Sequence, residues 1–153
     1  NPGLLLKIYG WNLMNETEKI VITLDSNVFR NQEFINFLIA EKDNFIIILP
    51  SNVFIETSFY YLTRGLKIDD FEKDIQDFGG KFLDLTSKIA METAINAKKT
   101  TISFKHHARD LMIGCTTLSK DAILITYNIK DFIWMPKDTY CYPESLFEKY
   151  MNI

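Results

Sequence analysis

Four acidic residues could do chemistry together, because each lies after an apolar run or near the start of a helical stretch. Asp25 directly follows the apolar run Ile20–Leu24, and Glu56 lies shortly after a second apolar run. Asp110 opens a helical stretch, and Asp131 follows a third apolar run and a few polar residues. Hard divalent cations such as Mg²⁺ and Mn²⁺ prefer carboxylate oxygens. Four carboxylates that converge in space would therefore form a metal site.

Each acid taken alone also has a structural explanation. Asp25 is equally well placed to cap a helix that begins at Ser26, and Asp110 to interact with the dipole of the helix that it opens. Glu56 and Asp131, taken singly, are better explained as surface or loop charges. The joint pattern across four separate elements is what favours a site.

Alternating strand-like and helical segments must position these acids. Continuous apolar runs at Ile20–Leu24, Phe45–Leu49 and Ala122–Thr126 predict strands that are covered on both faces. Shorter strands are expected at Phe82–Leu85 and Thr139–Tyr142. Segments with helical apolar spacing separate the strands. This order predicts an α/β fold, a three-layer α/β/α sandwich with a mostly parallel central sheet.

Capping signals predict where several helices begin. Ser51 is expected to cap the helix that carries Glu56, and Pro143 to occupy the first position of a terminal helix. Thr100–His107 is expected to be a polar loop, followed by a helix over Asp110–Lys120.

The carboxyl edge of the predicted sheet is where the acids should meet. Ligands of open α/β sheets bind beyond the carboxyl ends of the strands, and Asp25 and Asn128 both follow strands there. Glu56 lies one turn into a helix that starts at this edge. Because helical side chains lean toward the helix N-terminus, its carboxylate can point back to the same place.

Composition indicates one ordinary globular domain. The chain has 153 residues, of which 47% are hydrophobic and 24% charged. The net charge of −3 argues against a strongly basic nucleic-acid-binding surface, but a cluster of metal-binding acids lowers the formal charge, so RNA binding stays open. The two cysteines form no disulfide framework, and no apolar run reaches 18 residues. We therefore expect a cytoplasmic protein without a membrane span.

The sequence also bears on domain organisation and on self-association. Residues 1–13 fit the rest poorly and are either an addition ahead of a natural start at Met14 or an N-terminal docking arm, while residues 14–153 are expected to form a single domain. The 12 phenylalanines exceed what one small core needs, which favours self-association, as a dimer.

The acidic segments resemble, in order, four motifs of the PIN-domain ribonucleases. The matching segments are Leu24–Val28, Pro50–Glu56, Arg109–Gly114 and Leu124–Phe132. The first and the fourth are the more specific. The resemblance covers roughly residues 20–150, and at this size the chain looks most like the VapC-type toxins of bacteria and archaea.

This resemblance implies a PIN-like domain that is a Mg²⁺- or Mn²⁺-dependent endoribonuclease, the toxin of a toxin–antitoxin pair. Asp25, Glu56 and Asp110 match the core acidic triad of the family. Asn128 or Asp131 matches the fourth ligand position, and both are kept as candidates. The resemblance also implies an antitoxin whose acidic or basic tail enters the cleft. Because an empty carboxylate cluster attracts cations, we expect an inhibitory peptide to insert an Arg or Lys among the triad and displace the metal.

Other positions match supporting parts of the family pattern. Thr126 matches a hydroxyl residue that orients the acids, and Asn27 belongs to the first motif beside Asp25. Gly114 stands where an alanine is usual, which we expect to be harmless. The stretch Leu66–Gly80 is expected to form a clip-like pair of helices.

A basic segment precedes Asp110. Lys105, His106, His107 and Arg109 are candidates for contacts with RNA phosphates, although a solvated basic loop explains them as well. The adjacent histidines lack the partner Cys or His residues that a zinc site needs.

Two functions of other classes compete with the nuclease. The first is a non-catalytic PIN-like scaffold that binds RNA or protein. The second is a receiver-like phosphoacceptor domain, which also uses a carboxylate at a strand end, Mg²⁺ and a Thr. Turnover of RNA would favour the nuclease, and phosphorylation by a small phosphodonor would favour the receiver.

Overall fold

Five parallel strands form the centre of the fold. The computed structural model describes residues 19–151. The strands are β1 (Ile20–Leu24), β2 (Phe45–Pro50), β3 (Gly80–Leu83), β4 (Ile123–Ile125) and β5 (Tyr140–Cys141). They lie side by side in the order β3-β2-β1-β4-β5, and all four pairings are parallel. The predicted parallel sheet is therefore confirmed.

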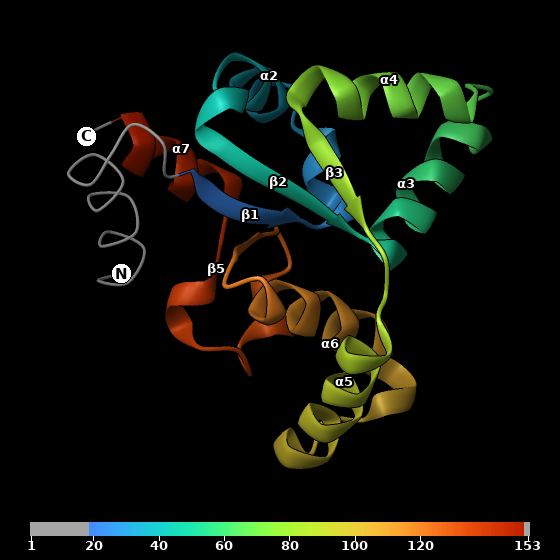
Figure 1. The fold of residues 1–153 in the computed structure, drawn as a ribbon, viewed down its shortest axis with the longest axis vertical. Coiled ribbons are helices and arrows are strands. Elements are labelled where there is room, and N and C mark those ends of the chain that lie inside the picture. Colours follow the sequence, from blue (N-terminus) through green and yellow to red (C-terminus); the bar gives the residue numbers. More distant parts are fainter. Residues whose placement is uncertain (1–18, 152–153) are drawn as a thin grey trace.

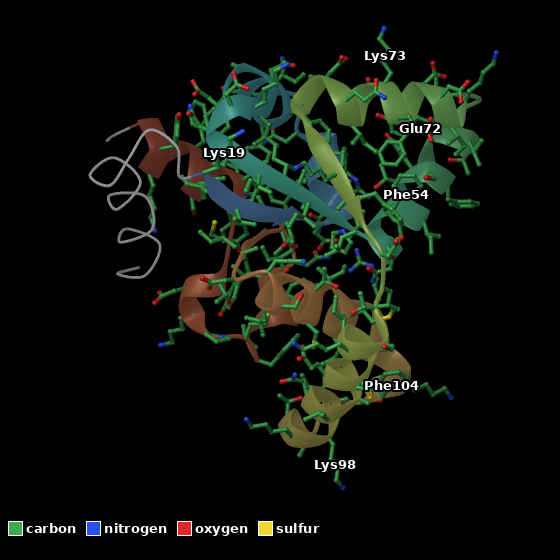
Figure 2. The ribbon with its side chains drawn as sticks, viewed as in Figure 1. Lys19, Phe54, Glu72, Lys73, Lys98 and Phe104 are labelled. Carbon is green, nitrogen blue, oxygen red and sulfur yellow. The ribbon has the colours of Figure 1, made fainter. Side chains whose placement is uncertain are left out.

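Helices cover both faces of this sheet. Figure 1 shows α2 and α4 on one side of the strands and α5 and α6 on the other, and in Figure 2 Lys73 of α4 and Lys98 of α5 point away from the sheet in opposite directions. The α-helices of the described part are α2 (Gln32–Ala40), α3 (Ser51–Thr63), α4 (Ile68–Phe78), α5 (Ser87–Thr100), α6 (Phe104–Ser119) and α7 (Pro143–Met151). Four short 3-10 helices join them: η1 (Ser26–Arg30), η2 (Lys42–Asn44), η3 (Ile129–Phe132) and η4 (Lys137–Thr139). The arrangement is the expected three-layer sandwich.

The apolar strands make the core. Ile22, Ile47 and Leu124, from the three central strands, are fully buried. Continuous apolar sequence is what strands covered on both faces require. The edge strand β3 is largely exposed instead. The three expected strands with continuous apolar runs thus became the middle of the sheet, and the two shorter ones became its edges.

The predicted loop before Asp110 is wrong. Helix α5 runs as far as Thr100 and ends where Thr101 adopts a left-handed conformation (φ 58°). Helix α6 then begins at Phe104, which is labelled in Figure 2. Exposed polar residues on one face of the first turns gave this segment its loop-like composition. Asp110 consequently lies in the second turn of α6, and no acidic residue stands in the first turn to interact with the helix dipole.

Two other local expectations also need correction. Pro50 is the N-cap of α3, and Ser51 is its first helical residue. The Ser51 hydroxyl donates a hydrogen bond to the carbonyl of Leu83 on β3 (2.9 Å) rather than to its own helix. The stretch 66–80 holds one helix, α4, rather than a pair, and α4 packs against α3 and α2.

The interpretation of residues 1–13 and of a start at Met14 lies outside the described residues. Within residues 19–151, no helix is both long and apolar enough to cross a bilayer.

Candidate active site

Asp25 is built into the end of β1. Its backbone N–H donates to the carbonyl of Ile125 on the neighbouring strand (3.0 Å), which continues the β1–β4 pairing. Its carboxylate Oδ1 accepts a hydrogen bond from the backbone N–H of Ser26 (2.8 Å) and caps η1. The side chain is 0% exposed. The two explanations of Asp25 are thus compatible, since the capping carboxylate is also held where the other acids meet.

The guanidinium of Arg109 joins three of the four predicted acids. Its Nε donates to Glu56 Oε1 (2.5 Å), its Nη1 to Asp110 Oδ1 (2.7 Å) and its Nη2 to Asp25 Oδ1 (2.5 Å). Charge-assisted hydrogen bonds of this kind are short and strong. Asp25, Glu56 and Asp110, carried by three different elements, therefore surround a single cation at the carboxyl edge of the sheet.

The charges of this cluster do not balance. Burial lowers the pKa of Arg109, but its hydrogen bonds to Glu56 and Asp25 and their charges outweigh burial and raise that pKa. Burial raises the pKa of Asp110, Arg109 opposes this, and the charges of Asp131 and Asp25 add to the rise. Three carboxylates around one guanidinium leave an excess of negative charge, which attracts further cations.

Asp25 is oriented by the residues expected to support it. Thr126 Oγ1 donates to Asp25 Oδ2 (2.7 Å), and Asn27 Nδ2 donates to the same oxygen (3.3 Å). The backbone N–H groups of Tyr127 and Asn128 in turn donate to Asn27 Oδ1 (3.1 Å) and Thr126 Oγ1 (3.0 Å). The end of β4 thereby fixes the carboxylate that follows β1.

Two residues that the sequence did not single out also belong to the cluster. The Ser26 hydroxyl donates to Glu56 Oε2 (3.2 Å) and lies 3.1 Å from Arg109 Nη2. Asn52 Nδ2 donates to the backbone carbonyl of Arg109 (3.0 Å) and so links α3 to α6. Both residues lie inside segments that resemble PIN-domain motifs. Their closeness in sequence to Asp25 and Glu56 was the only signal that could have predicted their place in the site.

Asn128 and Asp131 differ in their relation to the three acids. Asn128 is exposed, and the interaction that ties it to the site is made by its backbone N–H. Asp131 lies in η3 and is half-buried, and its charge acts on Asp110. Asp131 is thus the electrostatic neighbour of the triad. The choice of a fourth ligand stays a prediction.

The basic candidates lie on α6. His107 Nδ1 is 3.8 Å from Asp110 Oδ2, and His106 and Lys105 are exposed one turn or more before the acid. Arg109 alone among them contacts all three acids. Beside the acids a groove runs along η1 and α3, bounded by Asn27, Arg30, Glu56, Thr57 and Tyr60.

The donors suit a hard cation in type. All the side chains that converge are carboxylates, supported by a hydroxyl and an amide, and a positively charged group already stands among them. As they stand, however, no three His, Cys, Asp or Glu side chains within residues 19–151 are grouped closely enough to hold a metal ion. Each of the three carboxylates instead contacts a different nitrogen of the Arg109 guanidinium. Carboxylate oxygens are the type of donor that Mg²⁺ and Mn²⁺ prefer.

Gly114 has a packing role that the sequence did not reveal. A Cβ at this position would lie 2.4 Å from Cζ2 of Trp134 and 2.9 Å from the sulfur of Met135. Trp134 Nε1 donates to the carbonyl of Asp131 (3.1 Å). The glycine therefore lets the segment after η3 pack directly on α6, next to the acids.

Comparisons with known proteins identify the fold. Comparison of the sequence with protein-family models finds no match, and neither does comparison with curated proteins. The structure is similar to a chain of VapBC-1 from nontypeable Haemophilus influenzae, with a TM-score of 0.55 and 19% identity over 82% of this chain and 99% of that one. It is also similar to a chain of VapBC2 from Rickettsia felis bound to a DNA fragment from their promoter, with a TM-score of 0.58 and 18% identity over 80% and 98%. The chain therefore has the VapC-like PIN fold that its four motifs predicted.

Proposed function

We propose that this protein is a Mg²⁺- or Mn²⁺-dependent endoribonuclease and the toxin of a toxin–antitoxin pair. The observation that carries this proposal is the meeting of Asp25, Glu56 and Asp110 around one positive charge at the carboxyl edge of a parallel sheet. This edge is where open α/β folds bind their ligands. The fold shared with two VapBC structures supports the same function.

In the proposed reaction, Asp25, Glu56 and Asp110 hold the ion, with Asn128 or Asp131 as a further ligand. A divalent ion so bound supplies positive charge at the scissile phosphate and lowers the pKa of a water molecule. Thr126 and Asn27 keep the Asp25 carboxylate in one orientation through their hydrogen bonds to Oδ2.

The same surface offers contacts for RNA. Lys105, His107 and Arg109 lie within the first two turns of α6, just before Asp110, and are proposed to contact phosphates. The groove beside Glu56 is bounded by Arg30 and Tyr60, which supply a cation and an aromatic ring. Phosphate contacts and base stacking are the usual means of binding single-stranded RNA.

The proposed partner is an antitoxin. VapBC-1 and VapBC2, whose fold this chain shares, support such a partner. An antitoxin Arg or Lys inserted among Asp25, Glu56 and Asp110 would displace a metal, and Arg109 already demonstrates that these carboxylates accept a guanidinium. We also propose that the protein is a homodimer and that it acts in the cytoplasm.

Cleavage of single-stranded RNA tests the proposal. Wild-type protein should cleave it with Mg²⁺ or Mn²⁺ and stop in EDTA. Asp25→Asn keeps the shape of the side chain and removes a charge, and it should slow cleavage at least about 100-fold. Asp69→Asn, an exposed acid on α4, is the control. Equal cleavage with and without EDTA would refute the proposal, and absence of any cleavage with intact binding of RNA would favour the non-catalytic scaffold.

The strand order argues against the receiver-like alternative. Receiver domains of the CheY type have the order 2-1-3-4-5, in which β1 and β3 are neighbours. In this protein β2 lies between β1 and β3, and β3 is an edge strand. An acceptor aspartate at the end of β3 would therefore lie two strands away from Asp25.

A further inference from the structure

Arg109 is held by every donor group of its side chain. Each of its three nitrogens contacts a different carboxylate, and Nη2 also contacts the Ser26 hydroxyl. The carboxylates come from the end of β1, from α3 and from α6 itself. The guanidinium thus occupies the centre that the three acids share.

A divalent ion and this guanidinium cannot share these carboxylates. Asp25 Oδ1, Glu56 Oε1 and Asp110 Oδ1 each already accept a short hydrogen bond from Arg109. An ion bound by the same oxygens would place two or more positive charges in contact with a further one, and like charges at this distance repel strongly. The two cations must therefore exclude each other.

The cluster is built so that Arg109 can leave while the acids stay. The Arg109 side chain is 34% exposed, whereas Asp25 is fully buried. Thr126, Asn27 and the Ser26 N–H hold Asp25 without any help from Arg109. Departure of the guanidinium therefore removes one hydrogen bond to Asp25 and leaves the other three in place.

We propose that Arg109 is an internal counter-ion that competes with the divalent cation for Asp25, Glu56 and Asp110. Without metal it holds the carboxylates together, and it must turn out of the cluster before an ion binds. Binding of the ion then releases a guanidinium at the edge of the site, where it can meet an RNA phosphate. The identity of the ion rests on the proposed function, but the competition itself concerns only this side chain and these three acids.

Mn²⁺ binding by protein variants tests the competition without an activity assay. Free Mn²⁺ is measured by electron paramagnetic resonance during titration of wild type, Arg109→Gln, Arg109→Lys and the control Arg64→Gln. Arg64 lies at the end of α3, over the ring of Tyr60. Arg109→Gln should bind Mn²⁺ at least about tenfold more tightly than wild type, because a close positive charge is gone. Arg109→Lys should lie between them, and Arg64→Gln should match wild type.

The movement itself can be followed in the unaltered protein. The chain has three arginines, so the Nε–Hε signals of protein labelled with ¹⁵N-arginine are few, and Arg109→Gln identifies one of them. Addition of diamagnetic Mg²⁺ should move the Arg109 signal toward that of a solvated arginine and leave those of Arg30 and Arg64 unchanged. This arm decides the question even where Arg109→Gln does not fold.

The outcomes separate this inference from the proposed function. Equal or weaker Mn²⁺ binding by folded Arg109→Gln, or an Arg109 signal that Mg²⁺ leaves unchanged while the metal binds, would overturn the competition and leave the nuclease untouched. Tighter binding by Arg109→Gln without RNA cleavage by any variant would support the competition and contradict the nuclease. Failure of every variant to bind Mn²⁺ would overturn both.

Discussion

At the scale of single residues, Asp25 shows how this protein keeps a buried charge. Its two carboxylate oxygens accept hydrogen bonds from the Ser26 N–H, Arg109, Thr126 and Asn27. A buried carboxylate without such partners would be very costly. The donors come from elements far apart in the chain, so the charge of Asp25 also ties β1, β4 and α6 together.

Thr126 tests this support. Thr126→Val should lower the free energy of unfolding by about 1–3 kcal/mol, because Asp25 Oδ2 loses its closest donor and the Asn128 N–H loses its acceptor. Thr126→Ser keeps the hydroxyl and should lose much less. Urea denaturation of both variants measures the difference. Equal losses would mean that the Thr126 methyl group, rather than its hydroxyl, makes the contribution.

At the scale of the elements, η3 owes its place to α6. Gly114 of α6 leaves room for the ring of Trp134, and Trp134 donates to the carbonyl of Asp131. The element that carries a candidate ligand is thereby packed against the helix that carries Asp110. The missing side chain at Gly114 thus helps to fix the position of Asp131 in η3.

Gly114→Ala should therefore destabilise the protein, although it raises helix propensity. The added methyl group would overlap Trp134, and such overpacking costs typically about 1–3 kcal/mol. Thermal or urea unfolding measures the loss. In Trp134→Ala protein the same glycine change should cost much less. An identical loss in both backgrounds would show that the two residues do not interact.

We expect the attachment of α7 to weaken at high pH, because Tyr150 of α7 makes hydrogen bonds through a titratable hydroxyl. The Tyr150 hydroxyl donates to Glu41 Oε2 (2.7 Å) and accepts from Asn44 Nδ2 (2.7 Å). Burial, followed by the hydrogen bond and charge of Glu41, raises the pKa of Tyr150 to about 12. Because this folded pKa lies above the ordinary value of 10.0, the unfolded chain loses its proton first, and the stability that the proton contributes falls as pH rises from about 10 to about 12.

Tyr150→Phe checks this sign. The variant should be less stable than wild type at pH 8 by about 0.5–1.5 kcal/mol, and the gap should narrow as pH approaches about 12. Urea denaturation at several pH values measures the gap, with Tyr142→Phe as a control for loss of an exposed hydroxyl. A gap that widens with pH would contradict the assignment.

At the scale of the whole molecule, one face of α3 exposes several large apolar side chains. Ile55, Phe59 and Leu62 follow one another at helical spacing on α3 and are 68%, 67% and 53% exposed. Contiguous exposed apolar side chains of this kind often mark surfaces that bind other proteins. This stripe lies on the same helix as Glu56, so a partner bound to it would stand close to the acids.

The expected dimer can be tested at this stripe. Light scattering of wild-type protein should give twice the mass of one chain. Ile55→Lys combined with Phe59→Lys should give a single-chain mass, because two charges would have to be buried in the contact. Met91→Lys with Ile95→Lys, on the exposed face of α5, is the matched control. A dimer that survives the α3 changes would move the contact elsewhere, and a monomeric wild type would refute self-association.

Patterns in the sequence were enough to predict the architecture and the acidic residues of the candidate site. Short continuous apolar runs that are rich in isoleucine and bounded by polar or turn residues indicate strands covered on both faces. Alternation with helical segments then implies parallel pairing, which brings residues such as Asp25 to one edge. These conclusions depend on patterns that are only a few residues long, and such patterns can be recognised without knowledge of any tertiary contact.

The contacts of those acids, in contrast, could not be predicted from the sequence. Arg109 and Asp25 are 84 positions apart, and nothing local distinguishes an arginine that binds RNA from one that binds carboxylates. The start of α6 at Phe104 and the clearance at Gly114 likewise depend on neighbouring elements. The partner of a long charged side chain depends on which groups the fold brings within its reach, and that is a property of packing across the whole sheet.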